Sequence, residues 1–182
     1  FGGRVMTLAN GIETQDIEVW TEGSKIVFVG KPKAEELDGK VFEREYDLKG
    51  NLLMPSFKNA HTHSAMTFLR SYADDMPLQD WLFKQIFPME AKLDGEKVYW
   101  LTKLAILEYL TTGCTAAFDM YFELDDYVKA CIESGFRSVL CGAVSGDKSN
   151  LERLENNYLK YNGKDPLISF MLGFHAEYTC EK

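Results

Sequence analysis

From residue 51 onward, short apolar segments alternate with helix-length segments, and this alternation restricts the fold more than any other feature. The predicted strands span residues 51–61, 114–121, 136–144 and 166–178. The predicted helices span residues 77–90, 94–113, 123–135 and 150–163. Three of the helices end at a glycine, at Gly113, Gly135 and Gly163. Strands separated by helices predict a parallel sheet with right-handed crossovers.

Two α/β architectures fit this alternation, an open doubly wound sheet and half of an eight-stranded barrel. Neither a GxGxxG nor a GxxxxGK[ST] motif follows any predicted strand, so the nucleotide-binding form of the open sheet has no support. Polar residues instead collect at the strand ends, at His61, His63, Asp119, His175 and Glu177. Barrel enzymes keep their chemistry at that end. We therefore predict the first half of a TIM-like (β/α)8 barrel, in a chain that looks truncated after its fourth strand.

Residues 1–50 have a different pattern, because no helix-length segment separates their short apolar runs. Strands are predicted at 4–8, 16–23, 24–30 and 41–50, with a polar loop at 31–40. Short strands joined by turns predict a small antiparallel sheet of about five strands. This segment is expected to form a domain distinct from residues 51–182.

Charge and cysteine usage exclude several classes of function. The net charge is -8 and the pI is near 4.9, which excludes a basic nucleic-acid footprint. No apolar run reaches the about 18 to 20 residues of a membrane span, and no secretory signal is visible. The four cysteines form no CxxC pair, so they are read as free thiols, three of them in apolar elements. A cytoplasmic protein is expected.

His61 and His63 flank Thr62 directly after the apolar run "NLLMPSF". Side chains two apart on a strand point to the same face, so the two imidazoles could hold one divalent metal. The alternative is a structural pair at a strand end. Asp119 ends the next predicted strand and has two interpretations, support for the histidines or a cap on the turn that follows it.

Several segments resemble the amidohydrolase superfamily, specifically the metal-dependent deaminases of S-adenosylhomocysteine and methylthioadenosine and their chlorohydrolase relatives. The matching segments are "LLMPSFKNAHTHSAMTFLRSYADDMPLQDWLFKQIFPMEAKL", "GCTAAFDMYF", "RLENNYLKYNG" and "GFHAEYTC". The resemblance runs in order along essentially the whole chain. Ser56 stands where the family usually has glycine, at a turn position where some strain is expected.

The resemblance implies a (β/α)8 barrel flanked by an incomplete β-sandwich, with residues 1–50 supplying sandwich strands and residues 51–182 the first four β/α units. It implies that His61 and His63 are ligands of one divalent metal, zinc, with iron as the alternative. It also implies four substrate contacts: Trp81 and Glu90 line the nucleoside site, Arg153 meets an amino-acid tail, and His175 meets the purine. From the residues alone, Trp81 reads as packing, whereas Glu90 could equally be a solvated helix residue and His175 a core histidine.

The family's remaining metal ligands and its acid and base residues belong to later strands, which would follow Lys182. No second arginine is found in "LCGAVSG", which puts specific recognition of a homocysteine carboxylate in doubt, and no lysine for a two-metal centre is found in "LISFMLGFHAEY". The resemblance therefore implies a one-metal parent enzyme whose catalytic acid and base lie outside this chain.

Two functions from different classes follow from these observations. In the first, the complete parent deaminates an adenosine-type nucleoside with a metal-bound hydroxide, and the 182-residue chain alone is inactive. In the second, the chain is a non-catalytic fragment. If the parent is an enzyme, the alternatives to an adenosine-type deaminase are a triazine-type chlorohydrolase and a guanine- or cytosine-type deaminase. The expected partners are a small nucleoside or aminopurine-like substrate and either a second copy or the missing C-terminal half.

Overall fold

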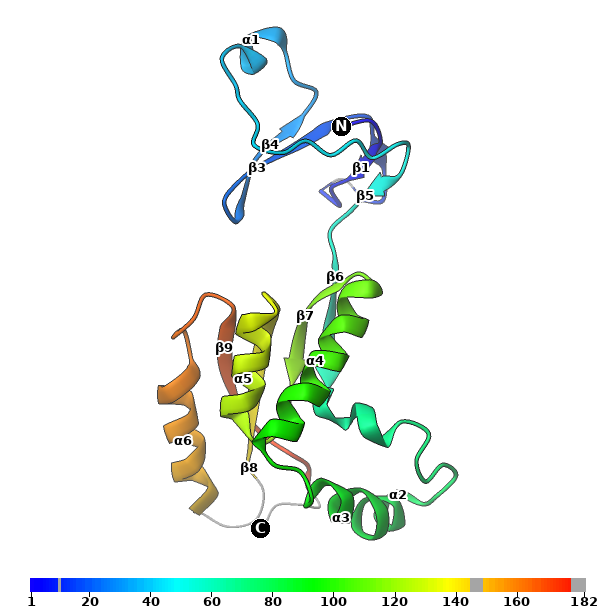
Figure 1. Ribbon diagram of the computed structural model, residues 1–182, viewed down its shortest axis with the longest axis vertical. Helices are drawn as coiled ribbons and strands as arrows, with labels where there is room; N and C mark the ends of the chain where they lie inside the picture. The colour runs from blue at the N-terminus through cyan, green and yellow to red at the C-terminus, as the bar shows by residue number, and fades with distance from the viewer. Residues whose placement is uncertain (10, 145–148, 178–182) are drawn as a thin grey trace. The chain divides into compact units, whose positions relative to one another are not determined.

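The computed structural model describes residues 1–9, 11–144 and 149–177. The chain divides into two compact units, Phe1–Ser56 and Phe57–Lys182 (Figure 1).

The first unit contains two small sheets. In one, β1 (Arg4–Met6) lies between β2 (Thr14–Gln15) and β5 (Leu52–Leu53), antiparallel to β2 and parallel to β5. In the other, β3 (Glu18–Glu22) and β4 (Lys25–Gly30) form an antiparallel hairpin, followed by a short helix α1 (Ala34–Leu37). The Trp20 and Phe28 rings stack across the hairpin with centroids 4.2 Å apart.

Three details of the predicted N-terminal sheet are wrong. The strands do not form one antiparallel sheet, the loop at 31–40 contains α1, and residues 41–50 form no strand. Phe42 packs its ring on Trp20, whereas Val41 is 94% exposed, so the alternation of this segment does not correspond to two faces of a sheet. Its end is instead joined to the first residues of the chain, by hydrogen bonds from Leu48 N–H to the Phe1 carbonyl (2.8 Å) and from Gly50 N–H to the Gly2 carbonyl (2.7 Å).

The predicted strand at 51–61 is divided into β5 and β6 (Phe57–Thr62). Pro55 lies in the gap and has no N–H to donate to a ladder, which explains the interruption. Ser56 does not have a positive φ, so the strain expected at this position is absent.

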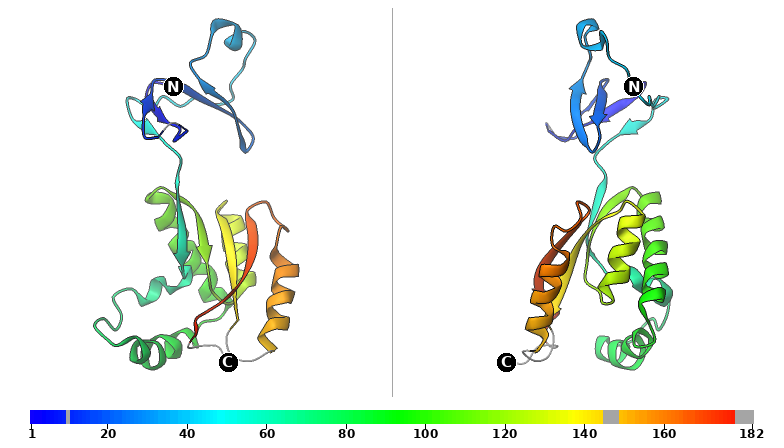
Figure 2. Two further views of the ribbon diagram at one scale, coloured as in Figure 1. Left: turned by 180° about the vertical axis from the view of Figure 1, so that it is seen from behind. Right: turned by 60° about the vertical axis from the view of Figure 1, so that its left-hand side comes forward.

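The second unit is a four-stranded parallel sheet in the order β6-β7-β8-β9, which confirms the predicted β/α arrangement. The later strands are β7 (Cys114–Asp119), β8 (Arg137–Val144) and β9 (Ile168–Phe174). Helices α4 (Gly95–Thr111), α5 (Leu124–Glu133) and α6 (Ser149–Tyr161) follow β6, β7 and β8. They cover one face of the sheet: α4 and α5 lie in front of the strands in Figure 1 and behind them in the reversed view of Figure 2, and α6 lies beside β9.

Local sequence explains where α4 begins and ends. The Asp94 carboxylate accepts the Lys97 N–H at 3.0 Å and caps the first turn. Gly113 has a φ of +82° just after the last turn, a conformation in which glycine has no steric cost. The buried residues of the helix recur at intervals of three and four: Val98, Thr102, Ala105 and Ile106.

Between β6 and α4 the chain forms a 3₁₀-helix, η1 (Ser64–Leu69), and then a helical segment at the predicted position. That segment consists of α2 (Leu78–Asp80), a π-helical stretch η2 (Trp81–Ile86) and α3 (Phe87–Glu90). A π-helical turn is rare and often lies at a functional site.

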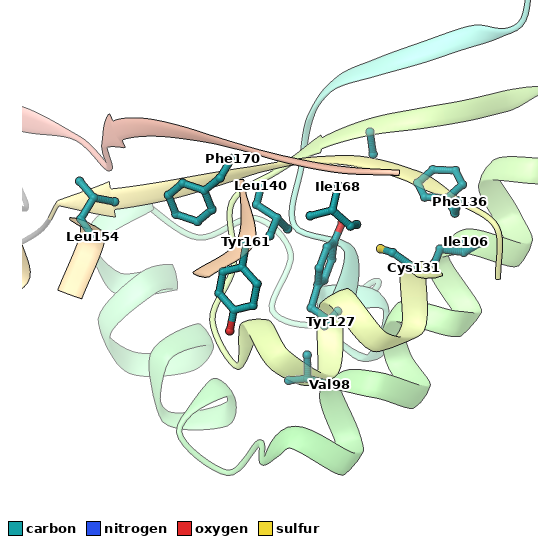
Figure 3. Packing of buried hydrophobic residues seen from close by; sticks show 12 residues of the cluster. Val98, Ile106, Tyr127, Cys131, Phe136, Leu140, Leu154, Tyr161, Ile168 and Phe170 are labelled. Atoms are coloured by element: carbon teal, nitrogen blue, oxygen red, sulfur yellow. The ribbon is translucent and has the colours of Figure 1, made fainter. Parts of the chain in front are cut away.

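The core of the second unit lies between the sheet and the three covering helices (Figure 3). It contains Ala65, Val98, Ile106, Ala117, Tyr127, Cys131, Phe136, Leu140, Leu154, Tyr161, Ile168 and Phe170. Cys114, Cys131 and Cys141 are buried free thiols, as predicted, and Cys180 lies outside the described residues. Within the described ranges, no helix combines the length and apolar character that crossing a bilayer requires.

Candidate metal centre

The carboxyl ends of the four parallel strands lie at one edge of the sheet, and the candidate site residues follow them. His61 lies in β6 and His63 directly after it, Asp119 ends β7, and His175 follows β9. Helices α2 and α3 and the beginning of α6 lie at this same end (Figure 1).

The two imidazoles lie side by side, with ring centroids 5.2 Å apart and planes at 84°. The strand before them is not regular. Asn59 pairs with Ala117 and Thr62 pairs with Asp119, so β6 has one more residue than β7 across this interval. The extra residue is a bulge, and the Asn59 side-chain oxygen accepts the His61 N–H at 3.2 Å inside it.

A backbone carbonyl determines the tautomer of His63. Its Nδ1 lies 2.7 Å from the carbonyl oxygen of Met120, the residue after β7. A carbonyl oxygen can only accept, so Nδ1 carries the proton. In the neutral ring the lone pair is then on Nε2, the arrangement found in histidines that bind metals.

Asp119 connects the end of β7 to the turn that follows the histidines. The residue is 1% exposed, and its two carboxylate oxygens lie 3.1 and 3.3 Å from the backbone nitrogen of Ser64. Burial raises the pKa of the carboxyl, and the hydrogen bonds from Ser64 partly oppose that shift. Of the two predicted roles, these contacts favour support of the histidine-bearing segment.

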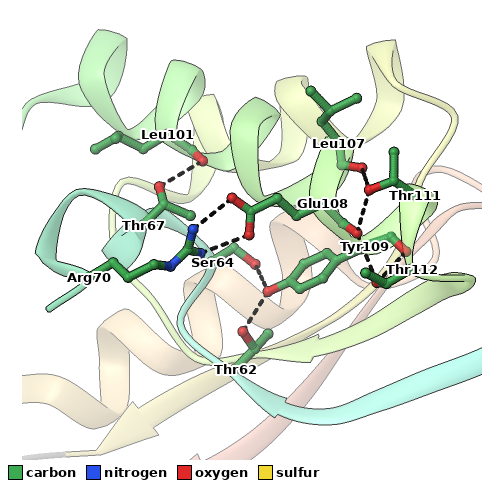
Figure 4. Close-up of polar contacts among 10 residues, drawn as sticks. All are labelled: Thr62, Ser64, Thr67, Arg70, Leu101, Leu107, Glu108, Tyr109, Thr111 and Thr112. Carbon is green, nitrogen blue, oxygen red and sulfur yellow. Dashed lines mark hydrogen bonds and ion pairs between the residues drawn. The ribbon is translucent and has the colours of Figure 1, made fainter.

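Three residues of α4, Leu101, Glu108 and Tyr109, hold η1 and the residues next to it (Figure 4). The Tyr109 hydroxyl lies 2.6 Å from Thr62 Oγ1 and 3.0 Å from Ser64 Oγ. Thr67 donates to the Leu101 carbonyl at 3.3 Å. Arg70 pairs with both carboxylate oxygens of Glu108, at 2.8 and 2.7 Å. The backbone on either side of His63 is therefore attached to a long, packed helix.

Glu90 ends α3 and lies near the turn after β7. The two segments share a shallow surface depression lined by Phe87, Glu90, Ala91, Leu93, Phe122 and Glu123. Burial raises the pKa of Glu90, while the nearby Tyr121 hydroxyl and His63 act in the opposite direction. The Tyr121 hydroxyl is buried without a hydrogen-bond partner among the described residues, and burial, followed by the Glu90 charge, raises its pKa.

Trp81 and Arg153 lie at the same end of the sheet, and in the part of the chain that the structure describes they are not joined to the histidine pair. Trp81 is half-buried at the first residue of η2, and Arg153 is exposed on α6. Within the described ranges, neither makes a hydrogen bond, ion pair or ring contact with His61 or His63. His175 is half-buried directly after β9.

The donor set fits part of a metal site. Imidazole nitrogens suit zinc and iron, and the hydrogen bond at His63 Nδ1 leaves the other ring nitrogen available. Residues 1–9, 11–144 and 149–177 contain no group of three or more His, Cys, Asp or Glu side chains arranged to hold a metal. The described residues can thus contribute two ligands of the same type and would need others to complete the coordination.

Four contributors to the site were not predicted from the sequence: Tyr109, Ser64, the Asn59 side chain and the Met120 carbonyl. A signal was present only for Tyr109, which continues the inward face of α4 three residues after Ile106. A tyrosine on such a face usually needs a partner for its hydroxyl.

Comparison with known proteins supports the likeness of this fold to metal-dependent deaminases. The amidohydrolase family matches residues 52–182. The 5-methylthioadenosine/S-adenosylhomocysteine deaminase of Desulfitobacterium hafniense (strain DSM 10664 / DCB-2) is 42% identical over 168 residues, 90% of this chain. The chain spans only 39% of that relative's length.

Two solved structures resemble the whole chain. An adenosine deaminase from Xanthomonas campestris with bound zinc is 28% identical, with a TM-score of 0.76 over 97% of this chain and 43% of that one. A guanine deaminase from C. acetobutylicum with bound guanine has a TM-score of 0.84 over 98% of this chain and 46% of that one. At 17% identity the second likeness concerns the fold alone.

Proposed function

The chain belongs to the amidohydrolase family, and we propose that a complete protein containing it is a metal-dependent hydrolase that deaminates an adenosine-type nucleoside of the S-adenosylhomocysteine or methylthioadenosine class. The relative from Desulfitobacterium hafniense supports this substrate class, and the zinc-bound adenosine deaminase supports the reaction type. In the same proposal, residues 1–50 supply strands of a β-sandwich and residues 51–182 supply the first four β/α units of the barrel.

His61 and His63 would hold one divalent metal, zinc in preference to iron, together with ligands from outside this chain. A bound metal of this kind supplies hydroxide by lowering the pKa of a coordinated water to about 7. The contribution of this chain is orientation: the Met120 carbonyl fixes the tautomer of His63, and the Asn59 side chain holds the backbone of His61.

The substrate contacts would come from the end of the sheet where the strands finish. The Glu90 carboxylate would accept hydrogen bonds from ribose hydroxyls, and Trp81 would line the nucleoside site. Arg153 would meet the tail of the substrate and His175 the purine. Glu90 has the most support, because the depression it lines also borders the turn after β7, which carries the Met120 carbonyl.

The observation that carries this proposal is the pair of imidazoles 5.2 Å apart at the carboxyl edge of a parallel sheet. The test is metal content together with product release on protein of verified length: ammonia from adenosine, methylthioadenosine, S-adenosylhomocysteine and guanine, and chloride from a chlorotriazine. We expect one metal per protein, lost in His61→Ala, and ammonia from the adenosine-type substrates. Metal retained in His61→Ala, or turnover of only guanine or the triazine, would contradict the proposal.

A second candidate is that the 182-residue chain by itself is a non-catalytic fragment. The observation that favours it is that only two metal-type ligands cluster in the part of the chain that the structure describes. Dialysis of the isolated chain against metal-free buffer tests this, because two imidazoles alone should release zinc that the complete protein keeps. Ammonia release by the isolated chain would refute it.

A further inference from the structure

The hydroxyls of Thr62 and Ser64, the residues on either side of His63, both reach the Tyr109 hydroxyl (Figure 4). The Tyr109 oxygen lies 2.6 Å from Thr62 Oγ1 and 3.0 Å from Ser64 Oγ. A phenol hydroxyl can donate one hydrogen bond and accept others, so both contacts can exist together. One atom of α4 therefore holds the chain before and after the histidine.

Tyr109 is itself held in place. It lies near the end of α4, and its ring stacks on the buried Phe136 ring with centroids 5.5 Å apart and planes at 23°. The helix also packs against β7 and α5, which belong to the same core. Movement of the hydroxyl would require this packing to rearrange, so the group is a rigid anchor.

His63 and Ser64 are also held from the neighbouring strand. The Met120 carbonyl holds Nδ1, and Asp119 holds the Ser64 amide, both from β7 and its end. These bonds all come from the neighbouring strand in the sheet. Tyr109 comes from the helix that covers the sheet, so it restrains the segment in the direction perpendicular to the strands.

We propose that Tyr109 is a positioning residue for the metal site: by binding Thr62 and Ser64, its hydroxyl fixes the backbone around His63 and thereby the direction of Nε2. The inference rests on the proposed role of His61 and His63 as metal ligands. Groups that orient metal ligands typically change metal affinity by about 10- to 100-fold when they are removed.

The experiment compares Tyr109→Phe with the parent in the complete protein. Zinc affinity is measured by competition with a chromophoric chelator, and the geometry is monitored through the visible absorption bands of the cobalt(II)-substituted protein. We expect affinity weaker by about 10- to 100-fold and shifted cobalt bands. Unchanged affinity together with unchanged bands would overturn the proposal.

A matched control separates positioning from a general loss of stability. Tyr161→Phe removes a tyrosine hydrogen bond of 2.8 Å to Asp125, which involves neither the histidines nor η1. This variant should keep the zinc affinity and cobalt spectrum of the parent, and a loss equal to that of Tyr109→Phe would refute a specific role.

If Tyr109→Phe does not fold, Thr62→Val and Ser64→Ala each remove one of the two contacts. Each should weaken zinc binding, and parental affinity in both would overturn the proposal. His61→Ala distinguishes the two levels of the argument. If it retains zinc, the proposed metal site fails and this inference with it; if it loses zinc while Tyr109→Phe does not, only the positioning role fails.

Discussion

The backbone N–H of Ser64 points at the carboxylate of Asp119, whose two oxygens lie 3.1 and 3.3 Å away. The two residues come from different parts of the sequence, since Asp119 ends β7 and Ser64 begins η1. An acceptor at the first residue of a helical turn satisfies an amide that has no partner within the turn. The contact therefore stabilises the turn directly after His63.

Because the Ser64 amide needs an acceptor, Asp119→Ala and Asp119→Asn should change the free energy of unfolding by different amounts. Asp119→Ala should lower the free energy of unfolding by about 1–3 kcal/mol, because the buried amide loses its partner. Asp119→Asn keeps an oxygen at that position and should lie closer to the parent. Urea unfolding of the complete protein measures both, and equal losses would show that the hydrogen bond to Ser64 is not what Asp119 contributes.

The Met120 carbonyl should keep neutral His63 in the Nδ1–H form before any metal binds. Nitrogen-15 NMR of histidine-labelled, metal-free protein distinguishes the two tautomers, and His63→Ala identifies the signal. We expect a protonated Nδ1 and an unprotonated Nε2 for this ring. Finding the proton on Nε2 would contradict the hydrogen bond and the proposed ligand atom.

Burial raises the pKa of Glu90 above its ordinary value of 4.5, and this has a defined effect on stability. As pH rises above the ordinary value, the unfolded carboxyl ionises first, so the folded state loses stability until its own raised pKa has been passed. Glu90→Gln does not ionise and should therefore be more stable than the parent near neutral pH, with the difference vanishing in acid. Melting temperatures across pH measure this.

The same variant tests the proposed binding role of Glu90. If the carboxylate accepts ribose hydroxyls, Glu90→Gln should lose about 1.5–3 kcal/mol of binding, roughly ten- to hundredfold in KM. A more stable variant with weaker substrate binding is the expected combination. An unchanged KM for an adenosine-type substrate would remove Glu90 from the site and leave its effect on stability intact.

Removing the hydroxyl of Tyr121 and that of Tyr109 should change the stability of the protein in opposite directions. Tyr121 buries its oxygen without a partner among the described residues, and an unpaired buried polar group costs about 1–3 kcal/mol. Tyr121→Phe should therefore stabilise the ligand-free protein, whereas Tyr109→Phe should destabilise it, because Tyr109 has two partners. Thermal unfolding of the pair checks the sign, and destabilisation by Tyr121→Phe would indicate a bound partner.

Sequence periodicity was sufficient for the parallel strands and the three covering helices of the second unit, because buried strands and amphipathic helices differ in the spacing of their apolar residues. It failed at residues 41–50, where apolar and polar residues alternate as in a strand but no neighbouring strand pairs with them. The parallel pairing of β1 with β5 was also missed, since it joins residues nearly 50 positions apart.

For the candidate site, the sequence identified the histidine pair but not what holds it. The bulge in β6 depends on how many residues of β7 lie opposite, and the bonds to Tyr109 and Met120 depend on packing between distant segments. None of these is a local property of the sequence. The roles of Trp81, Arg153 and His175 remain predictions from family resemblance.

The additional residue in β6 makes the spacing between Asn59 and Thr62 part of the site. Deleting Ala60 would remove this residue and let the ladder with β7 run evenly, but it would also make Asn59 adjacent to His61 and break the hydrogen bond between the Asn59 side chain and the His61 N–H. More regular pairing would thus remove the contact that holds the backbone of the first histidine. In this segment, length is as much a requirement as residue identity.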